Sequence, residues 1–131
     1  MAEHPNVGHI REGYDAFASG DFEKVSSLWD PSVVWHVGGQ SSLAGDYKGQ
    51  DEVFGYLGKA AELTGGTMKI EIHDILANDE HGAALITLMA ERDDGRSLEM
   101  NEVHVFHLSD GKVTEFWAFE EDQRRSDEFF A

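Results

Sequence analysis

Three side chains in this sequence, Glu102, His104 and His36, could act together as acids and bases. Glu102 and His104 lie two residues apart in the stretch LEMNEVHVFHLS, and His36 lies in the stretch VVWHV. An imidazole with a pKa near ~6.5 can accept or donate a proton close to neutral pH, and a nearby carboxylate can orient it or raise its pKa. One histidine could remove a proton next to a carbonyl group while the other polarises the oxygen. This combination suits isomerisation, aldol-type cyclisation, dehydration or epoxide opening, and we expect no cofactor.

The stretch that carries Glu102 and His104 has the alternation of a β-strand. One face would hold Leu98, Met100, Glu102, His104, Phe106 and Leu108. Burying an acid and a histidine among apolar side chains costs free energy unless each finds a hydrogen-bonding partner. We therefore expect this face to line a cavity, or to meet water or a second subunit.

A metal site would be another use for the same three residues. Two histidines and one carboxylate can bind iron or zinc in proteins. The sequence has no helical H-E-x-x-H motif. An acidic residue and a histidine two positions apart are also common in strands that bind no metal. We predict no metal site.

Composition limits the classes of partner. The chain has 131 residues, enough for one domain with a sizeable core, and we treat residues 1–131 as that domain. Its net charge of −16 argues against nucleic acid and against anionic membranes, so the ligand should be neutral or cationic. There is no cysteine, and no apolar run long enough to cross a bilayer. We expect a soluble, cytoplasmic protein.

Helical patterns come first in the chain and strand patterns follow. Apolar residues recur at three and four over 4–19, 22–29 and 51–63, which predicts three helices, with a short strand at 33–37 and a loop between that strand and the third helix. Strands are predicted over 68–74, 83–90, 98–109 and 113–122, separated by turns at 78–82, 93–95 and 110–112. The last ten residues are helix-like.

This order predicts an α+β fold. Four strands joined by tight turns form an antiparallel meander, and the helices cover one of its faces. We expect a strongly curved, cone-shaped antiparallel sheet with the three N-terminal helices packed on its concave side. The space between helices and sheet would be the ligand pocket.

Three segments of the sequence carry a resemblance to a known superfamily. They are YDAFASGDFEKVSSLWDPSVVWHVGG, LAGDYKGQDEVFGYL and VHVFHLSDGKVTEFWAFEED. In their order and spacing they resemble the nuclear transport factor 2-like superfamily, and within it the branch of SnoaL-like polyketide cyclases and ketosteroid isomerases. This scaffold serves enzymes, binding proteins and dimerisation modules, so the resemblance implies a fold more specifically than an activity.

The resemblance also implies roles for single residues. His36 falls where ketosteroid isomerases place their general-base carboxylate, and His104 falls where they hold a protonated acid that donates a hydrogen bond. Tyr14 lies one residue away from the position of the isomerase tyrosine. SnoaL-like cyclases use an aspartate near the end of the last strand, to which Glu121 or Asp122 corresponds. Neither complete catalytic set is present.

Aromatic residues near these positions are candidate walls for an apolar, neutral, ring-bearing ligand. The candidate ligand-binding residues are Trp35, Tyr14, Phe106, Phe116, Trp117, Phe119 and Asp122. A bulge in the first strand would exchange its faces, so either Trp35 or His36 faces the cavity. The branch also implies a homodimer formed through the sheet. Three function classes follow: a cofactor-free isomerase, cyclase or lyase; a protein that binds an apolar ligand without changing it; and a dimerisation module.

Overall fold

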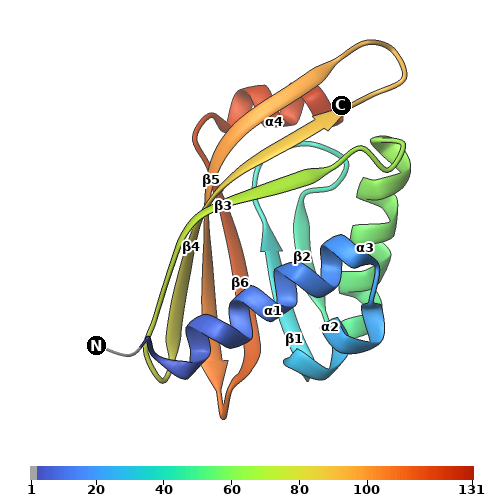
Figure 1. Cartoon of the computed structure of the whole chain (residues 1–131). Helices are drawn as coiled ribbons and strands as arrows, with labels where there is room; N and C mark the ends of the chain where they lie inside the picture. The colour runs from blue at the N-terminus through green and yellow to red at the C-terminus, as the bar shows by residue number, and fades with distance from the viewer. Residues whose placement is uncertain (1–2) are drawn as a thin grey trace.

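The computed structural model describes residues 3–131 and has an α+β fold with four helices and a six-stranded mixed sheet (Figure 1). The helices are α1 (Pro5–Ser19), α2 (Phe22–Leu28), α3 (Gln50–Leu63) and α4 (Gln123–Phe130). The strands are β1 (Trp29–Val37), β2 (Gly45–Lys48), β3 (Lys69–Ala77), β4 (His81–Glu91), β5 (Ser97–Ser109) and β6 (Lys112–Glu120). Among the described residues, no helix is long and apolar enough to cross a membrane.

The sheet differs from the predicted antiparallel cone. Its strand order is β2-β1-β6-β5-β4-β3, and β1 pairs with β6 in parallel while the other neighbours are antiparallel. The predicted cone is wrong, because the sheet is mixed and not strongly curled. The strand β2 was also missed, since its four residues lie among glycines in a stretch that looks like a loop.

The helices contact the sheet at different strands. Helix α1 contacts β3 and β4, α2 contacts β1, α3 contacts β1 and β2, and α4 contacts β5 and β6. Figure 1 shows α4 at the end of the sheet opposite the β5–β6 turn. All four helices lie against the face of the sheet that carries the buried side chains, so a space between them and that face is enclosed from several sides.

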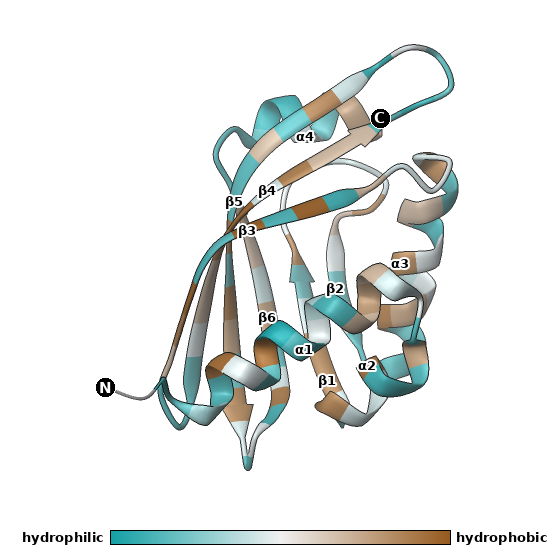
Figure 2. Ribbon diagram, in the orientation of Figure 1, coloured by the Kyte–Doolittle hydropathy of each residue, from teal (hydrophilic) through white to brown (hydrophobic). Residues whose placement is uncertain are grey.

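Strand β5 has the alternation predicted for it. Hydrophobic and hydrophilic residues alternate along the strands (Figure 2), and in β5 the buried side chains are Leu98, Met100, Glu102, His104, Phe106 and Leu108. The predicted alternation, which places these six side chains on one face of the strand, is therefore confirmed. Its apolar members join the core with residues from α1, β1 and β6.

The pairing of β1 with β6 decides which side chains of β1 face the helices. Trp35 lies beside Phe116, which is 5% exposed, and the two rings stack at a centroid distance of 4.0 Å. His36 lies beside Trp117 on the opposite, outer face of the sheet. Trp35, and not His36, therefore faces the helices.

This assignment of faces makes a prediction about two adjacent valines of β1. Val33 is 0% exposed and Val34 is partly exposed. Removing two methyl groups from a packed core position leaves a cavity, so Val33→Ala should lower the free energy of unfolding by about 2 kcal/mol. Val34→Ala should lower it by less than about 1 kcal/mol. Urea unfolding measures both, and equal losses would contradict the assignment.

Candidate active site

A cavity of about 150 Å³ lies between the helices and the inner face of the sheet. Residues from all four helices and from β1, β3, β4, β5 and β6 line it. Most of its wall is apolar, and the aromatic residues in the wall are Tyr14, Phe17, Trp29, Trp35, Tyr56, Phe106, Phe116 and Phe130. Such an enclosed, mostly apolar space with a few polar groups is typical of a small-molecule site.

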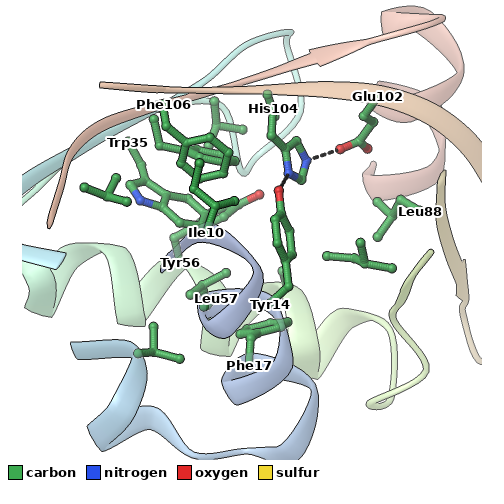
Figure 3. A pocket seen from close by; sticks show the side chains of 18 of the residues that line it. Ile10, Tyr14, Phe17, Trp35, Tyr56, Leu57, Leu88, Glu102, His104 and Phe106 are labelled. Carbon is green, nitrogen blue, oxygen red and sulfur yellow. Dashed lines mark hydrogen bonds and ion pairs between the residues drawn. The ribbon is translucent and has the colours of Figure 1, made fainter. Parts of the chain in front are cut away.

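The polar side chains of the cavity form a hydrogen-bonded chain that links α1 to β5 (Figure 3). The Tyr14 hydroxyl lies 2.5 Å from His104 Nδ1, and His104 Nε2 lies 2.8 Å from Glu102 Oε1. His104 and Glu102 are each 7% exposed. The period of two in β5 places both side chains on one face, and Tyr14 reaches His104 from helix α1.

The ionisation states of this chain follow from its burial. Burial raises the pKa of Tyr14, and the nearby Glu102 carboxylate raises it further, so the phenol keeps its proton. Burial lowers the pKa of His104 to about 4, so its ring is neutral at pH 7. Tyr14 therefore donates to Nδ1, and the ring proton sits on Nε2 and is donated to Glu102.

A second carboxyl group, that of Glu120, lies next to Glu102. The two residues are direct partners in the β5–β6 pair, where side chains on one face lie about 5 Å apart at Cβ. Both line the cavity, and each carboxyl group shifts the pKa of the other. In each, the Oε2 atom is buried and accepts no hydrogen bond from an N–H or O–H donor of residues 3–131.

One proton shared by the two carboxyl groups accounts for this arrangement. Burial raises the pKa of Glu120 to about 8, and contact with Glu102 adds to the shift. Burial also raises the pKa of Glu102, but the hydrogen bond from Glu120 opposes the shift. Because Glu102 also accepts a hydrogen bond from His104 Nε2–H, its ionised form is favoured. At neutral pH Glu120 is therefore the protonated partner and Glu102 the carboxylate.

Some of the residues singled out from the sequence lie at this cavity and others do not. Those at the cavity are Glu102, His104, Tyr14, Trp35, Phe106 and Phe116. Trp117 stacks on His36 on the outer face, and the Phe119 side chain is 54% exposed. Asp122 caps α4 by accepting a hydrogen bond from the Arg125 backbone N–H. These last three residues do not line the cavity, because alternation in β6 turns Trp117 and Phe119 outwards and the strand ends before Asp122.

His36, a candidate catalytic residue from the sequence, also lies outside the cavity. Its Nδ1 lies 2.7 Å from Asp46 and its Nε2 lies 2.6 Å from Glu115, both outside the cavity. Burial lowers the pKa of His36, but the hydrogen bonds to Glu115 and Asp46 outweigh it and the pKa is raised. A histidine held between two carboxylates across β2, β1 and β6 ties strands together and cannot reach a ligand in the cavity.

The separation of His36 from Glu102 bears on the metal site considered from the sequence. The two side chains lie on opposite faces of the sheet, so they cannot share an ion with His104. Within residues 3–131, no group of three or more histidine, aspartate or glutamate side chains is arranged to hold a metal ion.

Two residues of the site were missed from the sequence, Glu120 and Tyr56. Alternation from Phe116 and Ala118 would have pointed to Glu120, but Glu121 and Asp122 were considered instead because of the family comparison. Tyr56 projects from α3, and burial and then the acidic groups of Glu102 and Glu120 raise its pKa, so its hydroxyl stays protonated. No motif marks this tyrosine, since its place depends on how α3 packs.

The fold is that of nuclear transport factor 2-like proteins, as the similarity to solved structures of that class indicates. The chain matches the SnoaL-like domain family over residues 10–116 and belongs to that family.

The relatives extend over nearly the whole chain. Uncharacterized proteins of Mycobacterium tuberculosis and Mycobacterium bovis are 30% identical to it over 132 residues, which cover 100% of both chains. The structure of Bal32a, from a soil-derived mobile gene cassette, is similar with a TM-score of 0.91 and 33% identity over 96% of each chain. IdmH of Streptomyces antibioticus, a proposed polyketide cyclase, has a TM-score of 0.75 and 21% identity, over 90% of this chain and 93% of its own.

The opposite environments of the two histidines predict opposite titrations. His104 should stay neutral, with its proton on Nε2, from pH 8 down to about pH 5, because its pKa is lowered to about 4. His36 should still be protonated above pH ~6.5, because two carboxylates raise its pKa. Nitrogen-15 NMR of the imidazole rings measures both. A His104 ring that titrates near pH 6.5 would contradict the assignment.

The shared proton predicts a pH dependence of stability. The folded Glu120 keeps its proton up to about pH 8, whereas an unfolded glutamate loses it near ~4.5, so the folded state binds more protons in between. The free energy of unfolding should therefore contain a contribution that is lost as pH rises from about 4.5 to 8. Glu120→Gln should remove this part of the slope. Glu99→Gln, an exposed change on the other face of β5, should keep it; chemical unfolding at pH 5, 7 and 9 compares the three proteins.

Proposed function

We propose that this protein is a cofactor-independent enzyme that moves a proton within a small, apolar, neutral ligand, as an isomerase, cyclase or lyase does. The observation that carries the proposal is the Glu102–Glu120 pair, which lies on the wall of a mostly apolar cavity and has a buried oxygen without a donor in each carboxyl group. When the surroundings of two titratable groups move their pKa values apart, one group is protonated and the other ionised at the same pH. Such a pair provides both an acid and a base.

The pair can act on the two ends of a carbonyl group and its neighbouring carbon. The Glu102 carboxylate takes a proton from that carbon, and the electrons of the C–H bond form a carbon–carbon double bond. Glu120 gives its proton to the carbonyl oxygen, so an enol forms without any net change of charge in the cavity. Return of a proton to a different carbon completes an isomerisation, and attack of the enol carbon on a second carbonyl completes a cyclisation.

His104 and Tyr14 position the base in this scheme. The Nε2–H group of His104 holds Oε1 of Glu102, which leaves Oε2 for the proton. Tyr14 fixes the ring tautomer by donating to Nδ1. This second layer of hydrogen bonds sets the orientation of the reacting group, as outer partners do in other acid–base sites.

The walls of the cavity favour a ligand with a ring. Eight aromatic side chains line the same cavity as the carboxyl pair, and the related fold of IdmH, a proposed polyketide cyclase, is compatible with a ring-bearing ligand. The same walls also favour the runner-up function, a protein that binds an apolar ligand without changing it. Catalytic turnover of the ligand distinguishes the enzyme from the binding protein.

Proton exchange into a simple ring ketone tests the proposed chemistry. The wild-type protein should accelerate deuterium exchange at the carbons next to the carbonyl of cyclohexanone in D₂O, followed by proton NMR. Removal of the base in Glu102→Gln should lower the exchange rate by roughly 10²-fold or more. Tyr14→Phe should lower it less, because it acts through His104.

His36→Ala is the matched control, because His36 lies outside the cavity. This variant should exchange the ketone protons at the wild-type rate. An unchanged rate in Glu102→Gln would contradict the proposal. Binding of cyclohexanone without exchange above the buffer rate would favour the binding protein.

We also propose that a second copy of this chain covers the outer face of the sheet. Four of the five large hydrophobic residues that are exposed lie on this face, namely Leu76, Leu85, Val103 and Phe119. Leu85, Val103 and Phe119 form one row across β4, β5 and β6. Copies with a net charge of −16 repel one another, so they can meet only where the surface is apolar, and a two-fold contact brings the same patch together twice.

Analytical ultracentrifugation tests this association. The wild-type protein should sediment as a dimer, and Val103→Glu combined with Phe119→Glu should give a folded monomer, because four buried charges would then face one another. Phe22→Glu, at an exposed aromatic residue on α2, is the control and should remain a dimer. A monomeric wild-type protein would rule out the dimer.

A further inference from the structure

The cavity holds a negative charge that no lysine or arginine in its wall balances. Within residues 3–131, the two histidines that line it are His104, which is neutral at pH 7, and His9, which hydrogen-bonds to Asn6. Glu102 is 7% exposed, and an oxygen of Glu102 and one of Glu120 have no donor from the protein. Buried carboxyl oxygens without a donor are unfavourable, so a cation that donated N–H bonds to both groups would be bound strongly.

Part of the cavity wall, around Val113 and Phe116 of β6, also suits a cation. The faces of aromatic rings attract positive charge, most strongly those of tryptophan. Trp29 and Trp35 lie in the wall, 5.4 Å apart at their ring centroids, and Trp35 stacks on Phe116. The net charge of −16 further raises the concentration of cations around the protein.

We propose that the cavity has a second ligand class, small protonated amines, which bind by replacing the proton that Glu102 and Glu120 share. The ammonium group donates N–H bonds to both carboxylates, and the displaced proton leaves to solvent. One positive charge enters and one proton leaves, so the net charge of the cavity is unchanged. This goes beyond the proposed function, because an amine removes the acid that the proposed proton transfer needs and should therefore inhibit it.

No other group beside the pair would take up or release a proton in this exchange near neutral pH. The groups that face the pair from the surrounding elements are Tyr14 of α1, Tyr56 of α3, His104 of β5 and Ser126 of α4. Burial keeps both tyrosines protonated and the histidine neutral. The proton released on amine binding therefore comes from Glu120.

The size of the cavity selects the probe. A cavity of about 150 Å³ has room for a benzene-sized ring and a short substituent. Benzylamine meets this requirement, and benzyl alcohol is its neutral counterpart with the same ring and length. The two probes differ in charge, which is the property in question.

Isothermal titration calorimetry at pH 7 tests the proposal on the wild-type protein. Benzylamine should bind at least tenfold more tightly than benzyl alcohol. Its binding enthalpy should differ between phosphate and Tris buffers by an amount that corresponds to release of up to one proton, whereas that of benzyl alcohol should not. Benzyl alcohol binding as tightly as benzylamine, amine binding without proton release, or no binding of benzylamine at millimolar concentrations would each overturn the proposal.

Two variants locate the effect. Glu120→Gln removes the exchangeable proton and one negative charge from the amine-bound state. It should therefore abolish proton release and lower the affinity for benzylamine at least tenfold, whereas the affinity for benzyl alcohol should stay within threefold of the wild type. Glu99→Gln, on the outer face, should behave as the wild type. The buffer comparison on the wild type decides the question even if Glu120→Gln does not fold. Because these measurements report binding alone, they are independent of whether cyclohexanone exchange is found.

Discussion

The burial of two carboxyl groups side by side is the constraint on which the rest of the site depends. Glu102 and Glu120 are paired across β5 and β6 on a face that the helices cover. Two negative charges at this separation in an apolar setting repel each other strongly, so the pair keeps one proton at neutral pH. That proton makes one residue an acid and leaves the other a base.

The fold supplies the conditions for this. Strand β5 places Glu102 and His104 on one face through its period of two, and α1 brings the Tyr14 hydroxyl onto the far side of the histidine. Removal of water by the helices lowers the pKa of His104 and raises that of Glu120. The outer face of the sheet is built differently, because the carboxylates around His36 there are partly exposed and raise the pKa of its ring. The pKa values of the two histidines are thus shifted in opposite directions on the two faces.

The sequence predicted what depends on local pattern. The alternation of β5 pointed to Glu102 and His104, and the helical spacing located α1 and the face that carries Tyr14. The residues that were misplaced depend on pairing between distant strands. Whether Trp35 or His36 faces inwards is decided by the parallel register of β1 on β6, where a bulge lies between Trp29 and Val34. Glu120 enters the site only because β6 pairs with β5 in one particular register, which is shifted between His107 and Leu108. Neither shift has a signal in a single sequence.

Infrared spectroscopy of protein labelled with carbon-13 glutamate tests the shared proton most directly. A protonated carboxylic acid and a carboxylate absorb at separate frequencies. The account predicts a protonated glutamate band in the wild-type protein at pH 7 that disappears as the pH rises through about 8 and is absent from Glu120→Gln. A wild-type protein in which every glutamate is ionised at pH 7 would contradict the assignment of acid and base.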